Sequence, residues 1–127
     1  MKNDEMKSLI QKYINFYNSF NIEGMLQLLD ENITFRNVSN GVINTETKGI
    51  NQFRRLAEQS KRIFSERYQT INHYSIKGDQ VEVEVDYEGI LATDLPNGPK
   101  AGETLKIKGK TIFTFKNKKL SVIEDYS

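Results

Sequence analysis

The sequence predicts an α+β fold in which three N-terminal helices pack against a long antiparallel sheet. Up to Phe64, apolar residues recur mainly at three- and four-residue spacing, which is typical of amphipathic helices. After Ser65, apolar and polar residues alternate, which is the period of half-buried strands. The chain has 127 residues and no Pro/Gly-rich break outside one loop, so we expect a single domain over residues 1–127.

Capping and turn residues place the first half of the chain. Asn21 is a suitable N-cap for the second helix, and Thr47 or Asn51 for the third. The polar stretch 38–48 contains Asn40-Gly41 and predicts a turn or small hairpin at the rim. The expected helices are 5–20, 22–29 and 50–64, and the expected strands are 33–37, 67–77, 80–92, 103–116 and 120–126.

The residue patterns of the two longest expected strands predict how these strands pair with each other. Valines alternate with acidic residues over 80–92, and apolar residues alternate with lysines over 103–116. If the strands pair antiparallel, facing residue numbers sum to about 194, which sets Glu88 opposite Lys106 and makes an acidic row meet a basic row. A slip by one residue would expose Val83 and Phe113, so we assign these charges to structure and not to catalysis. The connection 93–102 holds both prolines and is a candidate lid.

Composition narrows the classes of partner. The net charge is +1, so no global field attracts nucleic acid or an anionic membrane. The absence of cysteine excludes thiol chemistry and Cys-ligated zinc, and one histidine leaves little for a metal site, so we expect no metal and no cofactor. The polar N-terminus, and the lack of an apolar run near the ~18 residues of a spanning helix, predict a soluble, cytoplasmic protein.

Several short motifs accompany this order of helices and strands. They are Lys12-Tyr13-Ile14, Asn21-Ile22-Glu23-Gly24, Gly102-Glu103-Thr104, Thr111-Ile112-Phe113-Thr114-Phe115 and Lys119-Leu120. Together they resemble the nuclear transport factor 2-like superfamily, and more narrowly its SnoaL-like polyketide cyclase-type members. The resemblance implies a cone-shaped α+β barrel, in which a strongly curved sheet wraps around the helices, and a homodimer formed through the outer sheet face.

A strongly curved sheet cannot be filled by three helices, so we expect a pocket that takes a small hydrophobic molecule. The residues expected to contact it are Tyr13, Tyr17, Phe35, Asn37, Phe53, Tyr87 and Phe113. Arg36, Arg67 and Tyr87 could also donate hydrogen bonds to a polar ligand.

The superfamily includes ketosteroid isomerases, which use a carboxylate base and an oxyanion site of a tyrosine and a protonated aspartic acid. Tyr13 matches the helix tyrosine of these enzymes, and Thr111 falls near the second oxyanion group. Asn37 stands where the base carboxylate would lie. An amide cannot take a proton at neutral pH, so isomerisation by the usual route is not expected.

Asp125 is the first candidate catalytic residue. The ending Glu124-Asp125-Tyr126 resembles that of limonene epoxide hydrolase-like members, but Glu84 replaces their arginine. A two-residue turn at Asn117-Lys118 would leave Asp125 outside, whereas a three-residue turn with a bulge at 116–118 would bring it inward beside Thr111. The resemblance favours the inward position, where desolvation would raise the pKa of the carboxyl group.

His73 is the second candidate, because it is the only imidazole and could shuttle protons if it faced the pocket. Two functions remain open. One is cofactor-independent acid/base chemistry by Asp125 and His73 on an enolisable or ring-forming substrate; the other is a non-catalytic ligand-binding or dimerisation module. For an enzyme we expect both side chains to line one cavity, and the enzymatic hypothesis fails if both point to solvent.

Overall fold

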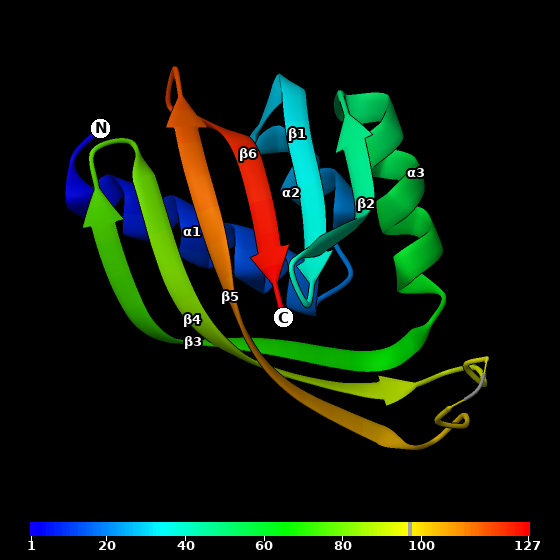
Figure 1. Cartoon of the computed structure of the whole chain (residues 1–127). Coiled ribbons are helices and arrows are strands. Elements are labelled where there is room, and N and C mark those ends of the chain that lie inside the picture. Colours follow the sequence, from blue (N-terminus) through cyan, green and yellow to red (C-terminus); the bar gives the residue numbers. More distant parts are fainter. Residues whose placement is uncertain (97) are drawn as a thin grey trace.

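A computed structural model describes residues 1–96 and 98–127, and these residues form three helices and six strands (Figure 1). In chain order the elements are α1 (Asn3–Asn18), α2 (Ile22–Gln27), β1 (Leu29–Ser39), β2 (Val42–Lys48), α3 (Ile50–Lys61), β3 (Phe64–Lys77), β4 (Gln80–Leu91), β5 (Thr104–Lys116) and β6 (Lys119–Tyr126). Asn97, which belongs to the candidate lid at 93–102, lies outside the described residues.

The caps of the two later helices differ in kind. The side chain of Asn21 accepts a hydrogen bond from the backbone N–H of Gly24 at 2.9 Å, which confirms the predicted cap of α2. The predicted caps of α3, Thr47 and Asn51, are wrong. Gly49 occupies the N-cap position with a φ of 85°, a left-handed conformation that glycine adopts without a steric penalty.

The six strands form one sheet in the order β2-β1-β6-β5-β4-β3 (Figure 1). The predicted α+β architecture is confirmed, but the sheet differs in two details from the antiparallel barrel that was expected. β1 and β6 pair in parallel. On its other side β6 pairs antiparallel with β5. The sheet also stays open, with β2 and β3 at its edges.

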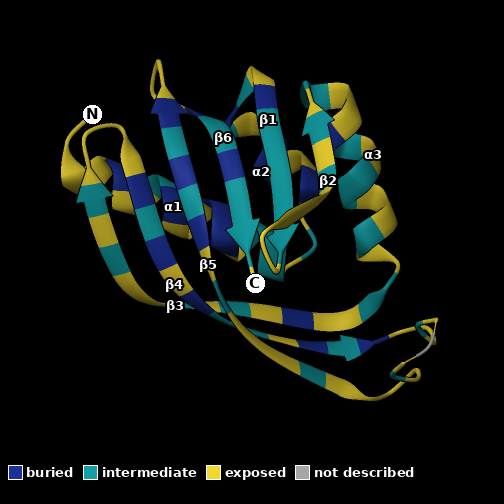
Figure 2. Ribbon diagram, in the orientation of Figure 1, coloured by how far each residue is buried: buried dark blue, intermediate teal, exposed yellow. Residues whose placement is uncertain are grey.

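The sheet is strongly curved, and the helices lie on one side of it (Figure 1). β3, β4 and β5 bend so that their ends near the 92–103 connection run away from the other strands. Figure 2 shows that β5 is mostly exposed in this outer part and alternately buried in the remainder. The core therefore gathers under the inner halves of the strands. Its most buried members are Ile10, Ile14, Ile33, Val81, Val83, Phe113, Leu120 and Ile123.

The predicted register of β4 and β5 is confirmed. Glu88 faces Lys106, Asp86 faces Lys108, and the pairing continues without a shift to the end of β4. Val83 and Phe113 are both 0% exposed. Two ion pairs join the strands, Lys108 with Asp86 at 3.9 Å and Lys110 with the diagonal Glu82 at 3.6 Å. Their side chains are largely exposed, so each contributes only a few tenths of a kcal/mol.

The β5–β6 hairpin combines parts of both predicted alternatives. Its turn has two residues, Asn117 and Lys118, with φ of 52° and 63°. The bulge lies further along, where Ser121 is an extra residue between the pairs Phe115–Leu120 and Thr114–Val122. The extra residue places Asp125 opposite Thr111.

Candidate functional site

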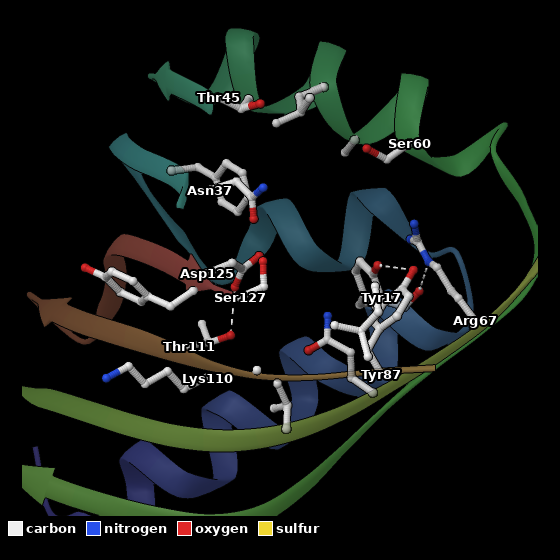
Figure 3. A pocket seen from close by; sticks show the side chains of 18 of the residues that line it. Tyr17, Asn37, Thr45, Ser60, Arg67, Tyr87, Lys110, Thr111, Asp125 and Ser127 are labelled. Carbon is white, nitrogen blue, oxygen red and sulfur yellow. Dashed lines mark hydrogen bonds between the residues drawn. The ribbon is translucent and has the colours of Figure 1, made fainter. Parts of the chain in front are cut away.

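A cavity of about 510 Å³ lies between the curved sheet and the helices, within the usual size range of small-molecule sites. Eight aromatic residues contribute to its wall, and several of their rings meet edge to face. All seven residues that the sequence suggested as ligand contacts line it: Tyr13, Tyr17, Phe35, Asn37, Phe53, Tyr87 and Phe113. The sheet contributes most of the polar side chains drawn in Figure 3.

Three polar residues align across neighbouring strands of the sheet. Asn37 of β1 pairs with Asp125 of β6, and Asp125 pairs with Thr111 of β5. Thr111 is buried, with 4% of its surface exposed. Its hydroxyl donates a hydrogen bond of 2.7 Å to a carboxylate oxygen of Asp125. Figure 3 shows this pair in the interior of the site. The carboxyl group thus has a fixed position in the cavity wall.

The environment of Asp125 favours its protonated form. Desolvation raises the pKa of this carboxyl from 3.8 to about 6, and the hydrogen bond from Thr111 opposes part of the rise. Asp125 is also the only Asp or Glu among the described residues that line the cavity. Because its pKa lies near neutral pH, the group can both accept and return a proton.

Tyr13 of α1 lines the same cavity as this carboxyl. Its ring packs edge to face on Phe113, with the centroids 5.8 Å apart. Burial, followed by the negative charge of Asp125, raises the pKa of the Tyr13 hydroxyl well above its usual value. Within the described part of the chain the hydroxyl has no hydrogen-bond partner. It is therefore a neutral donor available to a bound molecule.

Arg67 of β3 occupies another part of the wall, beside two tyrosines (Figure 3). The hydroxyls of Tyr17 and Tyr87 are hydrogen-bonded at 3.1 Å, and Arg67 Nε donates to the backbone carbonyl oxygen of Tyr17 at 2.9 Å. From the sequence we considered Arg67 only as a possible hydrogen-bond donor. Its position in the strand could have placed Arg67 in the cavity wall, because alternate residues of a strand share one side and Gln69 and Ile71 also point inward.

The expectation that His73 lines the cavity with Asp125 is wrong. His73 is exposed and is not among the residues of the cavity wall. The register of β3 against β4 shifts between Ile71 and His73, which leaves Asn72 as an extra residue. This bulge changes which alternate residues face inward, from Arg67 and Ile71 before it to Tyr74 after it.

The other carboxylates considered from the sequence lie elsewhere. Glu84 is exposed and Asp86 reaches toward Lys108, as the alternation of β4 predicted. The side-chain amide of Asn37 donates to the Asn44 side chain at 2.9 Å. The arrangement expected of an epoxide hydrolase-like site is therefore not assembled. Among the residues described, no cluster of three or more His, Asp or Glu side chains could hold a metal ion.

The comparisons with known proteins agree with the fold. The sequence profile described as the SnoaL-like domain matches residues 10–123. The chain belongs to the SnoaL-like domain family, within the nuclear transport factor 2-like superfamily. A search of curated proteins found no match. None of the described helices is long and apolar enough to span a lipid bilayer.

Solved structures of similar fold include proteins described as polyketide cyclases. One, a SnoaL-like polyketide cyclase from Jannaschia sp. CCS1, is 12% identical with a TM-score of 0.81, over 96% of this chain and 84% of that one. Another, from Xanthomonas campestris pv. campestris, is 18% identical with a TM-score of 0.76, over 98% and 90%. TerC, co-crystallised with polyporic acid, is 14% identical with a TM-score of 0.76, over 95% and 89%. At these identities the likeness establishes the fold alone.

Proposed function

We propose that this protein is a cofactor-independent acid/base catalyst that acts on a small, hydrophobic, enolisable substrate, by isomerisation or ring closure. One observation carries the proposal: a single carboxyl group, Asp125, sits in an aromatic cavity with a pKa raised to about 6. The descriptions of neighbouring structures as polyketide cyclases support the class of substrate.

In the proposed reaction the Asp125 carboxylate removes a proton from the carbon next to a substrate carbonyl. The electron pair of that C–H bond moves to the carbonyl oxygen, which the Tyr13 hydroxyl stabilises by a hydrogen bond. In an isomerisation, protonated Asp125 returns the proton to another carbon. In a ring closure, the enolate carbon bonds to a second carbonyl carbon, and the resulting alkoxide takes the proton from Asp125.

Proton exchange tests the proposal without knowledge of the natural substrate. The probe is 2-tetralone, a bicyclic enolisable ketone, whose exchange of α-protons in D₂O is followed by proton NMR. We expect catalysed exchange to rise through an apparent pKa near 6 and to fall by about 10²–10⁴-fold in Asp125→Asn. Asp86→Asn, which removes an outward-facing carboxylate of β4, should retain the exchange rate. Equal rates in the wild type, Asp125→Asn and buffer would refute the proposal.

A second function stays open because of the position of His73. His73 is exposed and lies outside the cavity. Among the described cavity residues, no side chain besides Asp125 is therefore of a type that ordinarily gains or loses a proton near pH 7. A non-catalytic protein that binds a hydrophobic molecule in the same cavity fits this observation. Binding of 2-tetralone without any accelerated exchange would favour this second function.

Self-association and location remain predictions. The family resemblance predicts a homodimer through the outer sheet face, although the Glu and Lys rows of β4 and β5 would make that interface unusually polar. Sedimentation equilibrium tests it, and a monomer at micromolar concentration would contradict it. The cytoplasmic location is a prediction from the polar N-terminus and from the lack of a long apolar run in the sequence.

A further inference from the structure

Arg67 is a buried cation without an anionic partner. It is 2% exposed, and no ion pair of the described residues includes it. Burial of an unpaired charge is costly, so a buried arginine is normally matched by a carboxylate or by a ligand. The polypeptide thus leaves a positive charge in the wall of a largely apolar cavity.

The helix end accounts for part of this arrangement. Arg67 Nε donates to the carbonyl oxygen of Tyr17 in the last turn of α1, where the helix dipole favours a cation. The guanidinium lies over the rings of Tyr17 and Phe20, 3.7 Å and 4.4 Å from their centroids. The hydrogen bond uses one of the five N–H groups of the guanidinium, and the ring contacts use its planar surface. The four terminal N–H groups have no hydrogen-bond partner among the described residues.

Further donors lie at the same place. The hydroxyls of Tyr17 and Tyr87 share one hydrogen bond of 3.1 Å, so one hydroxyl hydrogen remains free whichever group donates. Figure 3 shows Arg67 and these tyrosines on one side of the site, with Asp125 and Thr111 on the other. The cavity therefore has a donor-rich end with a buried cation, separate from the end that holds Asp125, where the exposed Lys110 also lies.

We propose that the Arg67 end binds the carboxylate of an aromatic or polycyclic organic acid, and so directs its hydrophobic body toward Asp125. A guanidinium presents parallel N–H groups that match the two oxygens of a carboxylate. The aromatic walls suit a flat hydrophobic body. The inference deepens the proposed function by naming the charge and orientation of its substrate, and it rests on that function only in using the same cavity.

Two probes of the same shape test the inference. 2-Naphthoate carries a carboxylate, and 2-naphthamide is its neutral counterpart. We expect the wild-type protein to bind naphthoate about tenfold or more tightly than naphthamide at low salt, by calorimetry or NMR titration. Arg67→Gln should bind the two probes equally, whereas Arg55→Gln, which alters an exposed arginine of α3, should retain the preference.

Three results would overturn the inference: equal affinities in the wild type, no binding of either probe at millimolar concentration, or an undiminished preference in folded Arg67→Gln. If Arg67→Gln does not fold, the wild-type comparison and the Arg67 Nε–H signal decide together, because Lys110 also lines the cavity. A second readout is the Arg67 Nε–H signal, assigned by its loss in Arg67→Lys, which should move with naphthoate and not with naphthamide.

The two proposals fail separately. Exchange of 2-tetralone protons depends on Asp125 and needs no anionic group, whereas the naphthoate preference depends on Arg67 and needs no proton transfer. A naphthoate preference without catalysed exchange would refute the proposed function alone. Catalysed exchange without a naphthoate preference would refute the anion site alone.

Discussion

In the β4–β5 hairpin, residues pair without interruption from Gln80–Thr114 to Ile90–Thr104, whereas the β5–β6 hairpin contains one extra residue, Ser121. The two hairpins share β5 and face the same helices, yet only the first has a register that its sequence specifies. Its valines and its acidic residues occupy opposite faces, so any slip would be costly. In β6, Val122 and Ile123 are both apolar, and either could have faced the core.

The difference has a functional consequence, because Asp125 lies two residues after Ile123. A regular hairpin would place Asp125 opposite Lys110 on the outer face, where it would be a solvated carboxylate. The bulge at Ser121 instead pairs Asp125 with Thr111 in the cavity wall. One residue of register therefore separates an ordinary surface charge from a candidate acid/base group.

The largest expected effect distinguishes the two faces of β6. Ile123 is 1% exposed and belongs to the core, whereas Val122 is half-buried opposite Thr114. Ile123→Ala should lower the free energy of unfolding by about 2–5 kcal/mol, and Val122→Ala by about 1 kcal/mol or less. Urea unfolding measures both variants. A reversed order of these two losses would show that β6 has the regular register.

The next effect concerns pH. The folded-state pKa of Asp125, about 6, lies above its ordinary value of 3.8, so the native protein holds this proton more tightly than the unfolded chain. Its contribution to stability is present below about pH 4 and is lost as the pH rises to about 6. Asp125→Asn removes this loss and should be more stable than the wild type at pH 8, by on the order of 3 kcal/mol.

At pH 4 the advantage of Asp125→Asn should largely disappear, because the wild-type carboxyl is then protonated. Thermal unfolding at the two pH values measures the difference, and Asp86→Asn on the outer face of β4 is the matched control. A stability difference between Asp125→Asn and the wild type that does not change with pH would contradict a raised pKa.

A smaller effect tests the contact between β5 and β6. Thr111→Val removes the hydroxyl that donates to Asp125, at a cost of about 1–3 kcal/mol in hydrogen bonding to a charged group. Because that hydrogen bond lowers the pKa of Asp125, its loss should raise the pKa above 6. Carbon-detected NMR titration of the carboxyl measures the shift. Thr114→Val, on the outer face of the same strand, should leave the titration unchanged.

The smallest effect belongs to the hairpin with the regular register. Lys108→Glu places a like charge opposite Asp86 and should cost less than about 1 kcal/mol, since both side chains are solvated. The double variant Asp86→Lys/Lys108→Glu should recover the loss at low salt. If reversal of this one pair unfolded the protein, the charge rows would stabilise the fold far more than their exposure allows.

Residue pattern alone predicted much of this molecule. The family resemblance helped to predict seven residues of the cavity wall. The pattern by itself predicted the three helices, the cap at Asn21 and the register of β4 and β5. These features depend on local chemistry or on an alternation that has one low-energy arrangement. The position of His73 could not be predicted in this way, because a bulge beside Asn72 changes the parity of β3 without any apolar signal.

What only the tertiary structure decided is which side chains share the interior. The bulge at Ser121 turns Asp125 inward, and the parallel pairing of β1 with β6 brings Asn37 beside it. The end of α1 and the curve of β3 bury Arg67 against Tyr17. Each arrangement depends on contacts between segments far apart in the chain, where a shift of one residue costs little locally and is fixed only by the packing of the whole.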